Sequence, residues 1–268
     1  MRFLVTLLCI LGLGVAALAA EPVTMTFIAG SGYIVSQGDL RIAIDGLTSL
    51  ETPETTQALM AAAQPPFNVN VILVTHSDPD HFDASLIVSN VTANPLAILI
   101  GPANVVRAVL AQAPTLDPAR LIVVHPGLSS PQTVEAAGLS IDVFSFPYPG
   151  PENVGYRFRV GGLTFVDPGD LNFDTIASDF ARTGLSRTGL SQAGIIQETT
   201  DVLILPYFLF NAEYRTAIPA CPARLYVPPH AQLNSLSLAC TLARGVTENV
   251  LCFAASLETR AIELAPQP

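Results

Sequence analysis

The chain has 268 residues, of which 50% are hydrophobic and 13% are charged, and its formal net charge is −10. This composition excludes a disordered protein and supplies enough apolar surface for one large domain or two small ones. All 12 basic residues are arginines and they form no cluster, which argues against nucleic acid or an anionic membrane as a partner.

The first 20 residues have the pattern of a secretory signal peptide. Arg2 precedes an apolar run over residues 3–13, and small residues end at Ala19 and Ala20. The apolar run is short for a membrane-spanning helix, so an uncleaved anchor is the weaker alternative. We expect residues 1–20 to be removed and residues 21–268 to form one domain, secreted or periplasmic, with no membrane attachment after cleavage.

Cys9 lies in the expected signal peptide, which leaves Cys221, Cys240 and Cys252. In an oxidising compartment one pair could form a disulfide, but the sequence does not indicate which pair. Buried thiols are the alternative. None of the cysteines has the C-x-x-C spacing of a zinc or redox site.

The mature chain begins with three short strands, over residues 23–28, 32–35 and 40–45, separated by turns that contain glycine. They predict an antiparallel meander. Asp45 ends the third strand and either supports a nearby site or forms a simple turn. Thr52 and Pro53 then predict the start of a helix over residues 52–64, with Thr52 as its N-cap.

The stretch over residues 69–83 joins a strand to a cluster of polar side chains. An apolar, β-branched run at residues 69–74 predicts a buried strand, and four potential ligands follow it at once: His76, Asp78, Asp80 and His81. A turn after a buried strand can aim several side chains at one point. Imidazoles and carboxylates at this spacing suit a divalent transition-metal cation such as zinc or iron. The alternative is a polar turn exposed to water.

The next segments alternate between helix and strand. The pattern predicts helices over residues 84–91 and 102–112 and strands over residues 96–100 and 120–124, which indicates a sheet with helices on one face. His125 ends the last of these strands. It is either a further ligand or an ordinary loop histidine.

A second series of strands occupies residues 139–146, 154–160 and 163–166 and predicts a second meander, which ends in Asp167-Pro168-Gly169-Asp170. Residues 171–200 are polar and predict a surface excursion or a flap. A strand at 201–206, an aromatic run at 207–210 and a strand ending at His230 follow. A helix at 233–243 and strands at 250–254 and 259–264 complete the expected elements.

The segment T-H-S-D-P-D-H-F at residues 75–82 resembles the His-x-His-x-Asp-His signature of the metallo-β-lactamase superfamily, with Asp78 at the second histidine position. Asp170 resembles the bridging aspartate of that family, and His230 its last metal histidine. The chain is most similar to the ascorbate-6-phosphate lactonase-like branch. The resemblance implies an α/β fold, an αββα sandwich, with a divalent metal site at the sheet edges. Zinc is the first expectation, with manganese or iron as alternatives.

The resemblance also implies a ligand set for two metal positions: His76 and Asp78 at the first, Asp80, His81 and His230 at the second, and Asp170 bridging them. The family's remaining histidine is missing from residues 145–156. A rigid, proline-rich loop without a ligand is the first interpretation, and Tyr148 or Glu152 as a substitute oxygen ligand is the alternative. Asp78 adds a negative charge, which weakens activation of a bound water. We therefore expect one secure metal position and an uncertain second one.

Two functions follow from the resemblance. The first is a secreted metal-dependent hydrolase in which a metal-bound hydroxide attacks an ester, lactone, amide or phosphoester, with Asp80 orienting the water or relaying its proton. The alternative is a catalytically impaired relative that binds a metal or a ligand on the same scaffold. We expect a small-molecule substrate, but the sequence identifies neither that substrate nor an oligomeric state.

Overall fold

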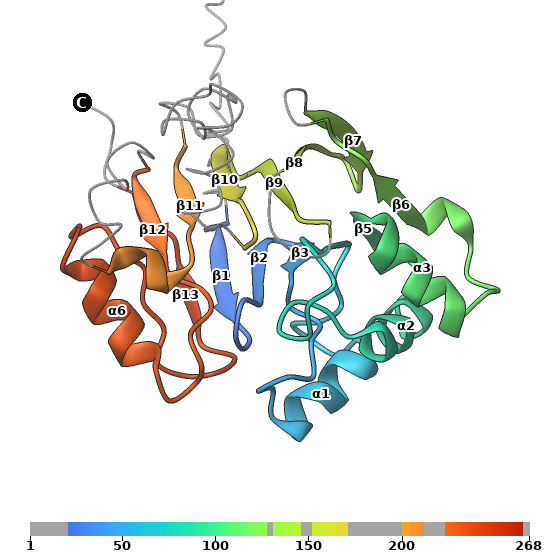
Figure 1. Ribbon diagram of the computed structural model, residues 1–268, viewed down its shortest axis with the longest axis horizontal. Helices are drawn as coiled ribbons and strands as arrows, with labels where there is room; N and C mark the ends of the chain where they lie inside the picture. Colours follow the sequence, from blue (N-terminus) through green and yellow to red (C-terminus); the bar gives the residue numbers. More distant parts are fainter. Residues whose placement is uncertain (1–20, 128–130, 146–151, 171–199, 212–222, 265–268) are drawn as a thin grey trace, which may run out of the picture.

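The structure, a computed structural model, describes residues 21–127, 131–145, 152–170, 200–211 and 223–264. Two mixed β-sheets lie at its centre, and helices cover their outer faces (Figure 1). This arrangement confirms the predicted αββα sandwich. The expected signal peptide at residues 1–20 lies outside the described residues, as do Tyr148 and Cys221.

The first sheet has seven strands in the order β13-β1-β2-β3-β4-β5-β6. Strands β13, β1, β2 and β3 are antiparallel, which confirms the first predicted meander, and β3 to β6 are parallel. The central strand β4 is buried along its whole length, as expected for a parallel strand covered on both faces. The strands are β1 (Thr24–Phe27), β2 (Tyr33–Gln37), β3 (Leu40–Ile44), β4 (Val71–Leu73), β5 (Ile98–Pro102), β6 (Leu121–Val124) and β13 (Thr259–Ala261).

Three helices cover the outer face of the first sheet: α1 (Glu54–Ala61), α2 (Ala84–Ala93) and α3 (Ala103–Gln112). Their apolar sides place Met60, Ile87 and Val109 in one buried cluster with Ile72 and Leu99 of the sheet. A short 3-10 turn, η1 (Pro118–Arg120), leads into β6. The predicted alternation of helix and strand is therefore present.

The second sheet has six strands in the order β12-β11-β10-β9-β8-β7. Strands β7 to β10 are antiparallel, and β10, β11 and β12 are parallel. Parallel strands end at the same edge of a sheet, so the segments after β10 and β12 lie on one side. The strands are β7 (Gln132–Ala136), β8 (Leu139–Ser145), β9 (Val154–Val160), β10 (Leu163–Asp167), β11 (Val202–Ile204) and β12 (Leu225–Val227).

The 3-10 helix η2 (Tyr207–Phe210) and the helix α6 (Leu236–Arg244) cover part of the outer face of the second sheet. Leu209 and Phe210 are buried there with Val166 and Leu203, so half of the predicted aromatic run fills core. Between the two sheets the inward side chains form the main core. A disulfide joins Cys240 of α6 to Cys252, which settles the pairing that the sequence left open.

One expected strand is absent, and one strand was not predicted. Residues 250–254 form no strand: Val250 makes only an isolated bridge to Tyr226. The sequence reading also missed β7, an edge strand on which polar residues alternate with Val134 and Ala136. Among the described residues, no helix combines the length and the apolar character needed to cross a membrane.

Candidate metal centre

The turn after β4 carries four of the six predicted ligands. Thr75, His76 and His81 are buried, whereas Asp78 and Asp80 are partly exposed. The backbone N–H of His81 donates to the carbonyl of Asp78 at 2.9 Å, which closes the turn. The Thr48 hydroxyl donates to the carbonyl of Pro79 and ties the turn to the segment after β3. The strand and these bonds fix the direction of each side chain.

The other two predicted ligands come from the second sheet. Asp170 follows β10 and His230 follows β12, so both lie at the edge where these parallel strands end. The backbone N–H of His230 donates to the carbonyl of Gly30 at 3.1 Å. The side-chain amide of Asn153 donates to the carbonyl of Asp170 at 3.3 Å. Segments from both sheets therefore meet at one point.

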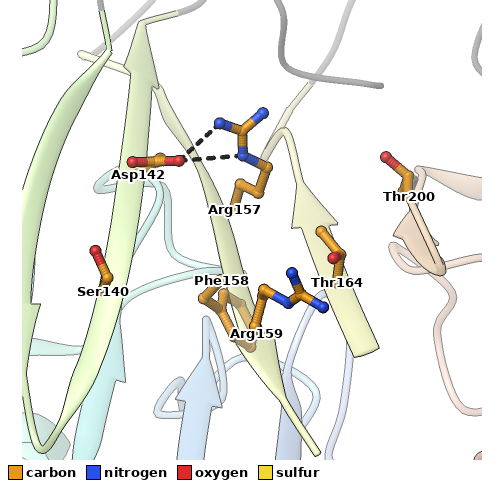
Figure 2. A pocket seen from close by; sticks show the side chains of 7 residues that line it. All are labelled: Ser140, Asp142, Arg157, Phe158, Arg159, Thr164 and Thr200. Carbon is orange, nitrogen blue, oxygen red and sulfur yellow. Dashed lines mark hydrogen bonds and ion pairs between the residues drawn. The ribbon is translucent and has the colours of Figure 1, made fainter. Parts of the chain in front are cut away.

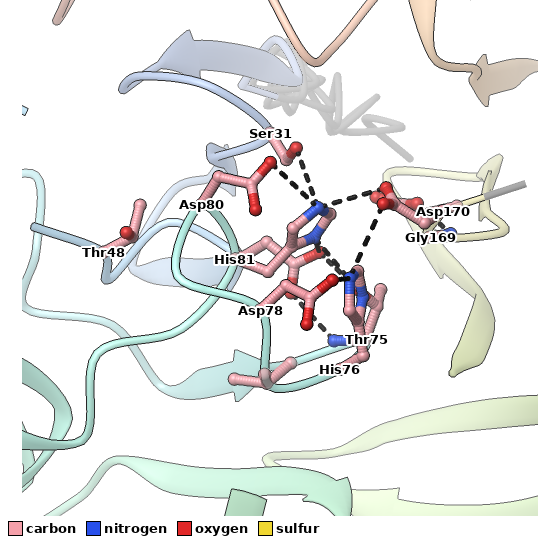
Figure 3. Close-up of polar contacts among 12 residues, drawn as sticks. Ser31, Thr48, Thr75, His76, Asp78, Asp80, His81, Gly169 and Asp170 are labelled. Carbon is pink, nitrogen blue, oxygen red and sulfur yellow. Dashed lines mark hydrogen bonds and ion pairs between the residues drawn. The ribbon is translucent and has the colours of Figure 1, made fainter. Parts of the chain in front are cut away.

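The carboxylate of Asp170 faces both His76 and His81 (Figure 3). Its Oδ2 is 3.6 Å from Nε2 of His76, and its Oδ1 is 3.1 Å from Nε2 of His81. Oδ1 also contacts Nε2 of His230, and the Nε2 atoms of His81 and His230 are 3.0 Å apart. One oxygen of Asp170 thus faces His76, and the other faces the remaining two histidines.

The two exposed aspartates reach different histidines. Oδ2 of Asp78 is 3.4 Å from Nε2 of His76. Oδ2 of Asp80 is 3.7 Å from Nε2 of His81 and 3.4 Å from Nδ1 of His230. Figure 3 shows the Asp78 carboxylate beside the His76 ring and the Asp80 carboxylate on the other side of His81.

These spacings suit divalent cations. Ligands about 2.1 Å from a tetrahedral zinc ion are separated by about 3.4 Å. The Nε2 atoms of His76 and His81 lie 3.1 to 3.7 Å from carboxylate oxygens of Asp78, Asp80 and Asp170, which is close to that value. The ligand atoms of His76, His81 and Asp170 lie within 4.8 Å of one another, as do those of Asp80, His81 and His230. Asp78 belongs to neither group. Five of the six predicted ligands are thus brought together as donors, and Asp78 joins them through His76 alone.

Asp45 holds the ring of His81 in position through a hydrogen bond. It follows β3 directly, with a φ of +47°, and is 2% exposed. Nδ1–H of His81 donates to Oδ2 of Asp45 at 2.7 Å, and the backbone N–H of Thr75 donates to Oδ1 at 2.8 Å. A carboxylate on Nδ1 fixes the tautomer and points Nε2 at the site. Of the two interpretations of Asp45, the supporting one is confirmed.

The close packing of imidazoles and carboxylates shifts the pKa values of His81, Asp170 and His76. Burial lowers the pKa of His81, but the carboxylates of Asp45 and Asp170 outweigh it and raise that pKa well above 6.5. Burial raises the pKa of Asp170, but hydrogen bonds from His230 and His81 outweigh it and hold that pKa far below its ordinary value. Burial and the neighbouring His81 lower the pKa of His76. Without a cation, a proton on His81 balances the carboxylates; a bound cation would replace it.

Asp167 has a different role from Asp170. Its Oδ1 accepts a hydrogen bond from the backbone N–H of Gly169 at 2.8 Å, so its side chain stabilises the turn that leads to Asp170. Burial and the Asp45 carboxylate raise the pKa of Asp167 to about 8. It is therefore protonated at neutral pH and does not add to the negative charge of the centre.

Two further residues near the centre were not predicted from the sequence. The hydroxyl of Ser31 is 3.2 Å from Nε2 of His81, and the hydroxyl of Thr75 contacts Asp45, His76 and His81. A serine between glycines and a threonine before a ligand are too common to signal these contacts. His125 is exposed at the end of β6, and Glu152 is exposed as well.

A separate hollow lies on the outer face of the second sheet (Figure 2). Its volume is about 290 Å³, and polar side chains of β8, β9 and β10 line it. Arg157 donates two hydrogen bonds to Oδ2 of Asp142, at 3.1 and 2.7 Å, so the charges of these two residues compensate each other. No histidine lines it, and it lacks the donor set of the centre between the sheets.

No family model matches the sequence, and no curated protein matches it. Solved structures do. The metallo-beta-lactamase fold protein YhfI from Bacillus subtilis superposes with a TM-score of 0.57 at 15% identity, over 90% of this chain and 99% of that chain. The metallo hydrolase Igni18 from Ignicoccus hospitalis gives 0.53 at 16% identity, over 91% and 99%. The diiron β-hydroxylase CmlA from Streptomyces venezuelae gives 0.54 at 8% identity, over 90% and 54%. The chain therefore has the metallo-β-lactamase fold.

Proposed function

We propose that this protein is a metal-dependent hydrolase whose centre consists of His76, Asp78, Asp80, His81, Asp170 and His230. The observation that carries the proposal is the position of Asp170, whose two oxygens face different histidines at distances that suit ligands of cations. The desolvation cost of burying this carboxylate must be offset by a positive charge, which a protonated His81 supplies in the metal-free centre and a bound cation would supply in its place. A fold by itself requires no such cluster.

When bound, a divalent ion would activate a water molecule and polarise the bond to be broken. His81 and His230 present Nε2 toward the centre, and Asp45 holds the His81 ring in place. Asp170 stays ionised because its pKa is far below neutral, so it can hold a cation but cannot carry a proton.

Asp80 is the residue best placed to move a proton. Its side chain is 35% exposed, against 12% for Asp170, so water reaches its carboxylate. It also lies beside both His81 and His230. We assign Asp80 the role of orienting the attacking water or accepting its proton.

The proposed substrate is a small molecule with an ester, lactone, amide or phosphoester bond. The ring of Phe208 lies edge-on to His230, with centroids 5.6 Å apart, and Phe208 is 38% exposed. An exposed aromatic side chain beside the centre favours a substrate with an apolar group. The net charge of −10 disfavours polyanions.

We also propose that the protein is secreted or periplasmic. The disulfide between Cys240 and Cys252 is typical of oxidising compartments, and the first 20 residues have the signal-peptide pattern. N-terminal sequencing of the protein exported by its host would test this assignment: a mature chain that begins near residue 20 supports it, and an intact Met1 contradicts it.

The alternative function is a relative that binds metal or ligand without turnover. Its support is Asp78, which stands outside both donor groups. The two functions separate on a panel of ester, lactone, amide and phosphoester substrates, with Asp80→Ala as the inactive comparison and the exposed Asp39→Asn as the control variant. Turnover that is lost only in Asp80→Ala supports the hydrolase. Metal binding without turnover by the parent supports the alternative.

A further inference from the structure

The centre has too few imidazoles to supply two equivalent metal positions. The whole chain has four histidines, and one of them, His125, is exposed at the end of β6 with its backbone N–H bonded to the side chain of Gln132. Three imidazoles therefore serve the centre. His81 has ligand atoms within 4.8 Å of those of both His76 and His230, but its Nε2 is only 3.0 Å from Nε2 of His230. We therefore assign His81 and His230 to one position, which leaves His76 as the single imidazole of the other.

Oxygen atoms complete the surroundings of His76. Oδ2 of Asp78 is 3.4 Å and Oδ2 of Asp170 is 3.6 Å from its Nε2 (Figure 3). The first position thus offers one nitrogen and two anionic oxygens. The second offers two nitrogens, from His81 and His230, with the oxygens of Asp80 and Asp170.

These donor sets prefer different cations. Imidazole suits zinc and iron, whereas carboxylate and water suit manganese and magnesium. Zinc binds any given site of this kind more tightly than manganese, but its advantage shrinks as nitrogen donors are replaced by oxygens. The side chain of Asp78 is 37% exposed, so the first position also opens to water, which hard cations retain as ligands.

We propose that the two positions bind different classes of divalent cation: the second takes zinc, and the first, at His76, Asp78 and Asp170, takes a hard, oxygen-preferring ion such as Mn²⁺. This inference rests on the proposed metal centre and adds the identity of its ions. Asp78 is then a selectivity residue rather than a damaged histidine position.

The test uses the full mature chain, stripped of metal and loaded with one equivalent of zinc. Mn²⁺ is then titrated in while the electron paramagnetic resonance signal of free Mn²⁺ is recorded, and bound metals are counted by mass spectrometry after gel filtration. We expect one zinc and one manganese per chain. Excess Mn²⁺ should not displace the zinc.

Variants at Asp78 provide the decisive comparison. Asp78→His adds an imidazole, so a second zinc ion should displace the bound Mn²⁺ at lower zinc concentration than in the parent. Asp78→Asn removes a charged oxygen and should lose bound Mn²⁺ while keeping the first zinc. Asp39→Asn, an exposed turn variant far from the centre, should behave like the parent. Circular dichroism of each variant establishes that it is folded.

The outcomes separate this inference from the proposed function. If neither zinc nor Mn²⁺ binds, the metal centre and the hydrolase are both wrong. If zinc binds but the zinc-loaded parent binds no Mn²⁺, the mixed pair is overturned and the hydrolase stands. The same conclusion follows if the parent, Asp78→Asn and Asp78→His bind Mn²⁺ with equal affinity. If the same zinc concentration fills both positions in the parent and in Asp78→His, the mixed pair is overturned as well.

Discussion

The carboxylate of Asp45 accepts a hydrogen bond from Nδ1 of His81 at 2.7 Å, although the two residues are 36 positions apart in the chain. Asp45 follows β3 and His81 follows β4, and these neighbouring parallel strands bring the two residues together. A buried carboxylate beneath a ligating histidine is a common support for a metal site. The contact therefore links the order of the strands to the chemistry of the centre.

Replacing Asp45 with asparagine should weaken metal binding by about 10- to 100-fold, the usual effect of removing such a support. Asparagine keeps an oxygen for the backbone N–H of Thr75 but loses the charge that holds the His81 ring. Competition with a chromophoric chelator measures the affinity. Asp39→Asn is the control, and an unchanged affinity in Asp45→Asn would contradict the role assigned to this residue.

Metal binding should strengthen as pH rises. The pKa of His81 is raised above 6.5, so in the metal-free protein the ring keeps its proton at neutral pH, and a cation must displace it. The same proton stabilises the metal-free fold below pH 6.5, and that contribution is lost as pH rises through the raised pKa. Calorimetric titration in two buffers of different ionisation enthalpy should detect proton release at pH 7. An affinity independent of pH would refute this prediction.

Replacing Gly169 with alanine should disturb the centre without touching a ligand directly. A Cβ atom there would lie 2.5 Å from Oδ1 of Asn153 and 2.9 Å from Cβ of Thr75, and the residue has a φ of +65°. The loop must shift, and Asp170 shifts with it. We expect a loss of about 2 kcal/mol in the free energy of unfolding, measured by urea denaturation, together with weaker metal binding.

Gly138→Ala is the matched control for this prediction. Gly138 has a φ of +77°, but a Cβ atom there would meet nothing within 4 Å. It should lose stability through backbone strain alone and keep its metal affinity. Equal metal affinities in the two variants would show that the packing of Gly169 does not position Asp170.

Phe208→Ala should raise KM for substrates with an apolar group and leave metal content unchanged. The Phe208 ring packs against the ring of His230 but has no atom that could bind a metal. Steady-state kinetics with paired apolar and polar substrates of one bond type would measure the effect. Leu238→Ala removes another exposed apolar side chain, on α6, and serves as control. Equal KM values in both variants would exclude Phe208 from substrate binding.

Much of the fold could be predicted because its elements are strongly patterned. The apolar run before His76 predicted β4, and the alternation of helix and strand after it predicted one face of the first sheet. The edge strand β7 was missed because only Val134 and Ala136 of it are buried, so its pattern is weak. The run at residues 250–254 is apolar enough for a strand, but there the chain makes a single bridge and carries a disulfide cysteine instead.

The candidate ligands could be predicted because four of them lie within six residues and the other two come shortly after strands. Their surroundings could not. Asp45 and Ser31 reach His81 only through the pairing of distant strands, and a sequence does not display such contacts. That the six candidate ligands bind a cation remains a prediction.

The measurement that tests the central claim most directly is the metal content of the mature protein, purified without chelator, beside the double variant Asp80→Ala/His81→Ala. A cation bound between the ends of β4, β10 and β12 requires these side chains. We predict at least one divalent ion per chain in the parent and its loss in the folded double variant. No bound ion in the parent, even after incubation with zinc, manganese or iron, would contradict the account.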